Sequence, residues 1–201
     1  MQFHVRLIDD PSASEVRLNG REDHWSYLDD HADHFIGRGP TFLEPDRFLS
    51  TIFFLEFADW DAVNSFLANE PHNRNRVYQD IKIWRWKDEY GRRQRDFPRD
   101  GNPTAWYLRG FGKRGAVEDW QKLRADHDEY CRRHSVAKFV VRGGIFDEAG
   151  ETWEGSAALV ALPDRDAVDA FLDQEPLHKN GLYDDFLVQR FKFGGRPGQV
   201  T

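Results

Sequence analysis

Apolar and polar residues alternate at matching places in the two halves of the chain, and each such stretch predicts a β-strand. The stretches that open and close each half are Phe3 to Ile8 with Ile81 to Trp86, and Ala105 to Phe111 with Phe186 to Phe191. Two further strand candidates lie between them in each half, at residues 35–42 with 49–57 and at residues 138–146 with 152–162. The pattern therefore predicts four strands in each half.

Between the strands, apolar residues recur every three or four positions, which is typical of a helix with one buried face. The longer stripe is Val117, Trp120, Leu123, His127, Tyr130 and His134, and its shorter equivalent is His24, Leu28, His31 and Phe35. Asp59 and Asp164 are N-cap candidates for a second, short helix in each half. A Glu-Pro pair ends that helix, because the residue before proline disfavours helical geometry. The order is β-α-β-β-α-β twice, the ferredoxin-like plan of the α+β class.

The two halves also match in sequence. Between residues 59 and 87, 13 of 29 positions are identical to those 105 residues later. Upstream, Arg21–Tyr27 and Arg124–Tyr130 both read R-x-D-H-x-x-Y, and a second histidine follows seven residues after the first in each copy. Two matched blocks in the same order indicate a tandem duplication.

A small sheet with helices on one face must also cover its other face. Two copies in one chain therefore predict that the two sheets face each other as a fused pseudo-dimer. We expect a first domain at residues 1–88, a charged linker rich in Gly and Pro at 89–103, a second domain at 104–193 and a loose tail at 194–201. Such a chain does not need a homodimer to complete its fold, although dimerisation through the outer edges stays open.

Composition narrows the class of partner. The 201 residues carry 28 Lys and Arg against 35 Asp and Glu, a formal charge of −7, which disfavours a nucleic-acid partner. The apolar runs are far shorter than the roughly 20 residues of a membrane span, and the N-terminus lacks the layout of a signal peptide. The single cysteine, Cys131, excludes an internal disulfide framework. We expect a cytoplasmic protein with a small-molecule partner and with neither a nucleic-acid nor a membrane partner.

The common signatures of nucleotide-binding proteins, metalloproteases and hydrolases are absent, so the repeated histidine and glutamate are the main candidates for chemistry. His24 and His127 lie early in the predicted long helix, and Glu70 and Glu175 lie where the short helix ends. A carboxylate at that turn could bind one imidazole nitrogen, fix the tautomer and raise the basicity of the other nitrogen. The alternative is that each histidine is a half-buried helix residue and each glutamate a cap.

Other repeated residues have a functional and a structural interpretation. His31 and His134 lie two turns beyond the first histidines, so each could join a set of two histidines and one carboxylate around a metal, or could simply complement a helix end. We predict no metal. Arg21 and Arg124 lie one turn before the histidines, where a guanidinium could bind a substrate carboxylate or form an exposed salt bridge. We group Tyr27 and Tyr130 with these arginines as candidate substrate-binding residues.

The ordered motifs resemble the YciI-like family of the dimeric α/β-barrel superfamily. That family combines a helix motif R-x-x-H-x-x-x-L, a Gly-Pro strand entry and a late segment F-x-x-x-D-P-(x4)-G-[LV]-Y. The first copy resembles the series at Arg21–Leu28, Arg38–Pro40 and Phe66–Tyr78, and the second copy resembles it at Arg124–His127, Arg142–Gly144 and Phe171–Tyr183. The resemblance implies a pseudo-dimeric α/β barrel and a His–carboxylate dyad in each copy.

Three positions depart from the family pattern. Both copies have Glu instead of Asp in the dyad, the first copy has Arg76 where the family has Gly, and the second has Gly144 where the family has Pro. Relatives implied by the resemblance include a chlorohydroxyhydroquinone dehydrochlorinase, with muconolactone isomerases in a neighbouring family. The resemblance therefore implies a cofactor-independent acid–base enzyme of lyase or isomerase type.

Its substrate is expected to be a small anionic or aromatic metabolite. His24 or His127 would remove the proton, Glu70 or Glu175 would orient the imidazole, and no cofactor is expected. A non-catalytic small-molecule-binding or accessory protein and a cofactor-free monooxygenase are the alternatives. We expect one dominant site and favour the second copy, because Gly181 tolerates a positive φ at a turn where Arg76 adds strain.

Overall fold

The computed structural model describes residues 1–43, 47–98, 104–196 and 199, and it describes the side chains of these residues except at 134–138. The first half consists of β1 (Gln2–Asp9), α1 (Ser14–Asn19), α2 (Arg21–Asp30), β2 (Phe35–Phe42), β3 (Phe48–Glu56), α3 (Trp60–Asn69), α4 (Pro71–Arg74) and β4 (Tyr78–Asp88). The second half consists of β5 (Ala105–Gly112), α5 (Val117–Lys138), β6 (Phe139–Phe146), β7 (Trp153–Ala161), α6 (Arg165–Leu172), α7 (Pro176–Lys179) and β8 (Tyr183–Phe191). The predicted order of elements is confirmed in both halves.

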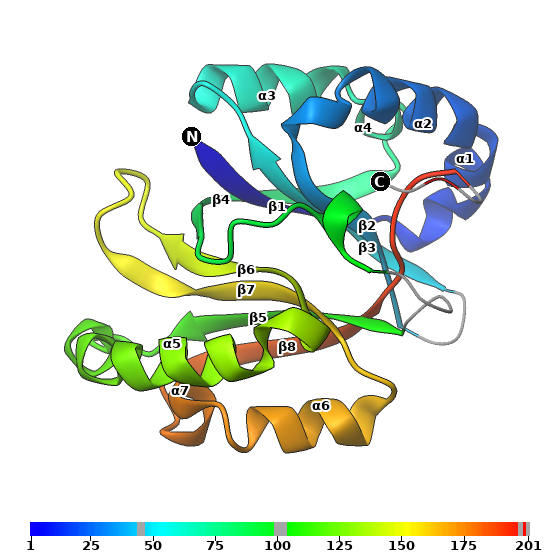
Figure 1. Ribbon diagram of the computed structural model, residues 1–201. Coiled ribbons are helices and arrows are strands. Elements are labelled where there is room, and N and C mark those ends of the chain that lie inside the picture. The colour runs from blue at the N-terminus through cyan, green and yellow to red at the C-terminus, as the bar shows by residue number, and fades with distance from the viewer. Residues whose placement is uncertain (44–46, 99–103, 197–198, 200–201) are drawn as a thin grey trace.

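The eight strands close into one antiparallel barrel in the order β1-β3-β2-β8-β5-β7-β6-β4. Each half supplies four neighbouring strands, and the halves meet at two junctions, β2 with β8 and β4 with β6. Helices α1 to α4 cover one side of the barrel and α5 to α7 cover the opposite side (Figure 1). The fused pseudo-dimer predicted from the duplication is therefore confirmed.

Side chains from both halves fill the barrel interior. Phe54 and Trp86 of the first half pack there with Tyr107, Ile145 and Leu159 of the second half. Within this interior the Tyr107 hydroxyl lies 2.7 Å from Nε2 of His4, so a hydrogen bond joins β1 to β5. Burial lowers the pKa of His4 to about 3, which keeps its imidazole neutral.

On the outer faces, each half has an apolar core between its sheet and its helices. Asp59 and Asp164 accept hydrogen bonds from backbone N–H groups three residues on, each at 2.8 Å, and so begin α3 and α6 as predicted. These helices bury equivalent residues, Phe66 and Phe171, against the strands.

Two local features differ from the prediction. Gly20 separates α1 from α2 in the first half, whereas the second half has the single helix α5. The Glu-Pro pair does end α3, but its glutamate also begins α4, and the same holds for α6 and α7 in the second half. The bounds of the two domains stay a prediction.

The segments predicted as linker and tail make specific contacts where the structure describes them. The buried Gln94 exchanges two hydrogen bonds of 3.0 Å with the backbone of Arg38. The C-terminal segment runs from β8 to the helices of the first half (Figure 1), where Arg196 pairs with Asp29 of α2. Residues 99–103 of the linker and 197–198 and 200–201 of the tail lie outside the described residues. No helix of the described chain has the length and apolarity needed to cross a membrane.

Candidate functional site

Both predicted His–Glu pairs come into contact. Nδ1 of His24 on α2 lies 2.6 Å from Oε1 of Glu70, and Nδ1 of His127 on α5 lies 2.6 Å from Oε1 of Glu175. All four residues are buried. An imidazole that donates Nδ1–H to a carboxylate keeps its lone pair on Nε2, so each pair has the geometry of an acid–base dyad.

The glutamates are held in place because they are helix N-caps. The two carboxylate oxygens of Glu70 accept hydrogen bonds from the backbone N–H groups of His72 and Asn73, at 3.0 and 2.9 Å. Glu175 accepts the equivalent bonds from Leu177 and His178, at 2.9 and 2.8 Å. The cap fixes each carboxylate while it binds the imidazole, which gives the longer glutamate side chain a defined position.

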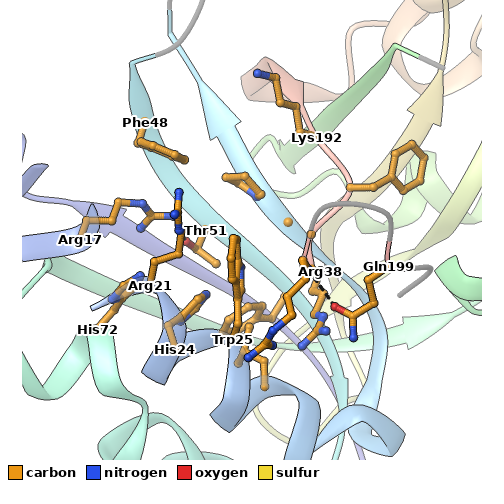
Figure 2. Close-up of a pocket in the computed structure, with 18 of the residues that line it drawn as sticks. Arg17, Arg21, His24, Trp25, Arg38, Phe48, Thr51, His72, Lys192 and Gln199 are labelled. Carbon is orange, nitrogen blue, oxygen red and sulfur yellow. Dashed lines mark hydrogen bonds between the residues drawn. The ribbon is translucent and has the colours of Figure 1, made fainter. Parts of the chain in front are cut away.

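A cavity of about 590 Å³ lies beside His24 (Figure 2). It is bounded by α1, α2, strands β2 and β3 and the C-terminal segment. Its basic lining residues are Arg17, Arg21, Arg38, Lys192 and Arg196, and its aromatic ones are Trp25, Phe42, Phe48, Phe53 and Phe193. No carboxylate is among the described residues that line it, so the cavity favours an anion with an apolar body.

Some of this positive charge is already paired. Arg17 lies 3.1 Å from Asp9, and Arg38 lies 2.9 Å from Asp29. The other terminal nitrogen of Arg38, NH1, is enclosed and has no hydrogen-bond partner within the described part of the chain. Arg21 lies over the ring of Trp25 and forms no ion pair with any described residue. Arg21 therefore has donors to spare for an anion in the cavity.

The pocket at the second dyad is much smaller, about 40 Å³. Leu177 occupies the position that His72 has in the first half, and Sγ of Cys131 lies 3.7 Å from Nε2 of His127. Burial lowers the pKa of His127, but hydrogen bonds with Cys131 and Glu175 outweigh burial and raise the pKa to about 10. His127 therefore favours the protonated form at neutral pH.

Glu89, His127 and Asp128 are spaced closely enough to hold a metal ion, with their ligand atoms within 4.8 Å of one another. However, the guanidinium of Arg142 already lies among them. Its NH1 atom is 3.2 Å from Glu89, 3.5 Å from His127 and 3.4 Å from Asp128. A fixed cation at this position leaves no reason to assign a metal here.

The remaining predicted site residues lie in different surroundings. Arg21 lines the cavity, whereas Arg124 lies over Trp120 and 3.8 Å from Asp128, in an exposed ion pair. The hydroxyls of Tyr27 and Tyr130 donate to the carbonyls of Phe66 and Phe171, at 2.9 and 2.7 Å. Neither tyrosine lines the pocket of its dyad, so both join helices rather than contribute to a binding surface.

Of the two second histidines, the structure describes the side chain of His31, which is bonded to the backbone of α2. Nδ1 of His31 donates to the carbonyl of Tyr27 at 2.8 Å, and His31 belongs to no metal-like cluster of the described residues. The side chain of His134 lies outside the described residues.

Sequence reasoning did not identify most of the cavity. Arg38 was noticed only as part of a strand-entry motif, and Arg17, Lys192 and Arg196 carry no motif. They meet at the cavity because β2, α1 and the C-terminal segment come together in the closed barrel. His72 had one usable signal, its replacement by Leu177 in the second copy.

The chain is similar to several solved structures. A 5-chloro-2-hydroxyhydroquinone dehydrochlorinase from Burkholderia phenoliruptrix, in complex with 2,5-dihydroxybenzoquinone, is 25% identical over 46% of this chain and 99% of its own, with a TM-score of 0.42. A chlorite dismutase from Candidatus Nitrospira defluvii is 9% identical over 96% of this chain and 91% of its own, with a TM-score of 0.61. A heme-binding protein from Thermus thermophilus is 13% identical over 94% and 90%, with a TM-score of 0.52. The last two likenesses concern the fold alone.

No curated protein matches the sequence. The model of the YCII-related domain matches residues 1–87 and, a second time, residues 107–192. These two segments cover most of the chain and coincide with the two halves of the barrel. The protein therefore belongs to the YCII-related family and contains two copies of its domain.

Proposed function

We propose that the first half is a cofactor-independent acid–base site, of lyase or isomerase type, for a small anionic molecule with a planar or aromatic body. The observation that carries the proposal is the position of His24. Its Nδ1 is bound to Glu70, which leaves the lone pair on Nε2, and the residue lines a cavity that also contains cations and aromatic rings. A base beside an anion-binding wall is what proton removal from an anionic carbon acid requires.

In the proposed reaction, Arg21 holds the anionic group of the substrate. Nε2 of His24 accepts a proton from a carbon atom, and Glu70 stabilises the resulting imidazolium through Nδ1–H. The backbone bonds to Glu70 keep the carboxylate in place as charge develops. The imidazolium then returns the proton to another atom of the substrate or to the leaving group.

The cavity volumes reverse our preference for the second copy. The space beside His24 is about 590 Å³ and that beside His127 is about 40 Å³, too small for an aromatic metabolite. A His127 that keeps its proton at neutral pH also lacks the lone pair of a general base. We therefore assign the chemistry to His24 and a structural role to the His127–Glu175 pair.

Phenylpyruvate is a suitable probe, because it has a carboxylate, an aromatic ring and acidic C–H bonds next to a ketone. We expect the protein to accelerate exchange of these hydrogens for deuterium in D2O, measured by proton NMR. H24A should reduce the exchange rate by about 10²–10⁴-fold, the usual contribution of a general base. The matched variant H127A should retain the rate.

Binding of phenylpyruvate without exchange would favour the non-catalytic binding protein. Equal losses in H24A and H127A would refute the assignment to the first half. The monooxygenase alternative requires O2, so a reaction that proceeds unchanged under nitrogen excludes it for this probe.

A further inference from the structure

A second imidazole lies beside the proposed base. The ring of His72, from the first turn of α4, stacks on the ring of His24 with centroids 4.1 Å apart and planes within 10°. His72 is 2% exposed and lines the same cavity. The equivalent residue of the second half is Leu177, so this histidine is not required for the fold of the repeat.

The surroundings of His72 select one tautomer. Its Nδ1 is enclosed and has no hydrogen-bond partner among the described residues. An enclosed N–H without an acceptor costs more than an enclosed lone pair, so Nδ1 is the unprotonated nitrogen. The proton then lies on Nε2, which is not among the enclosed atoms without a partner, and His72 lines the cavity.

The two stacked rings therefore present opposite groups to the cavity. His24 offers a lone pair on Nε2, because its Nδ1–H is bound to Glu70, and His72 offers an N–H. Figure 2 shows both histidines at the same side of the cavity, near Arg17 and Arg21. An acceptor and a donor on rings whose centroids are 4.1 Å apart match a substrate in which a C–H bond and a C=O group are adjacent.

We propose that His72 is a second catalytic residue of this site, a neutral hydrogen-bond donor to the substrate oxygen that becomes negative when His24 removes the proton. The inference rests on the proposed function and narrows the substrate class to an anionic carbonyl compound with a hydrogen on the carbon next to C=O. Nε2 of His24 forms an N–H bond as the C–H bond breaks. The C–H electron pair forms a C=C bond, and the C=O pair moves to oxygen, which accepts the hydrogen bond from His72.

A neutral donor suits this task. Burial, with smaller contributions from His24 and Arg17, lowers the pKa of His72 to about 2, so its imidazole stays uncharged at working pH. It can therefore bind the developing oxyanion without first taking a proton, and its proton does not leave as pH changes around neutrality. Tyr78, whose ring packs edge-on against His72, has its pKa raised by burial and also stays neutral.

The test compares three variants in the phenylpyruvate exchange assay. H72L copies the second half and removes the donor, H72Q supplies an amide donor, and H178L changes a histidine of α7 outside the cavity. We expect H72L to lose about 10²–10³-fold in exchange rate, as when one oxyanion donor is removed. Its Kd for phenylpyruvate, by titration calorimetry, should stay within about threefold, because the ground-state anion is held by Arg21. H72Q should recover at least tenfold, and H178L should match the wild type.

Nitrogen-15 NMR of the ligand-free protein tests the tautomer and charge of His72 on which the inference depends. We expect the His72 ring to be neutral with its proton on Nε2 from pH 5 to 8. A proton on Nδ1, or titration in that range, would overturn the inference. So would normal exchange by H72L, or an H72Q no faster than H72L. Loss in H24A with normal exchange in H72L would overturn this inference alone, whereas no exchange by the wild-type protein would overturn the proposed function as well.

Discussion

Two imidazoles that stay neutral in the folded protein link its stability to pH. His4 lies inside the barrel and His72 beside the cavity, and burial lowers their pKa values to about 3 and about 2. In the unfolded chain both take up a proton near pH 6.5. Between these values the unfolded state holds more protons than the folded one. The stability that depends on these residues is therefore complete above pH 6.5 and is lost as pH falls toward 3.

We predict that H72L weakens this dependence. Between pH 4 and 6, the free energy of unfolding should change by about 1.4 kcal/mol less per pH unit in H72L than in the wild type. This is the contribution of one proton that binds the unfolded state and not the folded state. Burial raises the pKa of Asp9 to about 6, which acts in the opposite direction, but this contribution is common to both proteins and cancels. Urea unfolding at several pH values measures the difference, and equal slopes would show that His72 titrates in the folded protein.

At the scale of elements, the turn after α4 has the same backbone conformation as the turn after α7, but it has arginine where the other turn has glycine. Arg76 has a φ of 56°, and the equivalent Gly181 after α7 has a φ of 64°. Arg76 is the one non-glycine residue with positive φ in the described chain. Its side chain is exposed and forms no ion pair with described residues, so nothing visible compensates for the strain.

The strain can be measured by exchanging the two residues. R76G should stabilise the protein by up to about 1 kcal/mol, because the left-handed region costs a side chain about 1–2 kcal/mol and glycine loses part of that gain in the unfolded state. G181R should destabilise it by about 1–2 kcal/mol. Thermal and urea unfolding provide both values. Loss of stability in R76G would mean that Arg76 makes a stabilising contact in solution.

The elements that sequence predicts well are those with a local cause. The strands and the capped helices follow from periodicity and from Asp59 and Asp164. Both His–Glu contacts join residues distant in sequence, and they are expected from the resemblance to a family with such a dyad. Helix α4 was not predicted, because the Glu-Pro pair was interpreted only as an end and not as an N-cap. The cavity wall depends on contacts between distant segments, such as Arg196 with Asp29, and no local pattern encodes such a pair.

At the scale of the whole molecule, the two junctions between the halves differ at Pro40. β4 and β6 are in register from Arg85 with Phe146 to Asp88 with Gly143, and β2 and β8 are in register at Thr41 with Phe191 and Phe42 with Arg190. In the same register, the backbone of Lys192 and Gly194 donates to Pro40 and Arg38, at 3.1 and 2.9 Å. Pro40 itself has no N–H to donate, so the β2–β8 junction lacks a backbone donor at this position.

We predict that the junction with Pro40 opens more often. Backbone amides of Phe42, Lys192 and Gly194 should exchange with deuterium faster than those of Lys87 and Gly144 under native conditions, because fewer bonds must break together. Residue-resolved hydrogen exchange by NMR measures this order. The reverse order, or equal rates at both junctions, would contradict it.

The difference between the two junctions affects how a fused chain of this kind can evolve. In a two-fold symmetric pair, every substitution appears twice, so both junctions must serve stability and access alike. Joining the copies in one chain removes that constraint. Here the junction beside the cavity contains Pro40, and Phe42 and Lys192 of the same junction also line the cavity, while the other junction contains no proline and lies away from it. One side of the barrel can therefore hold the molecule together while the other admits and releases small molecules, a specialisation closed to any pair of identical subunits.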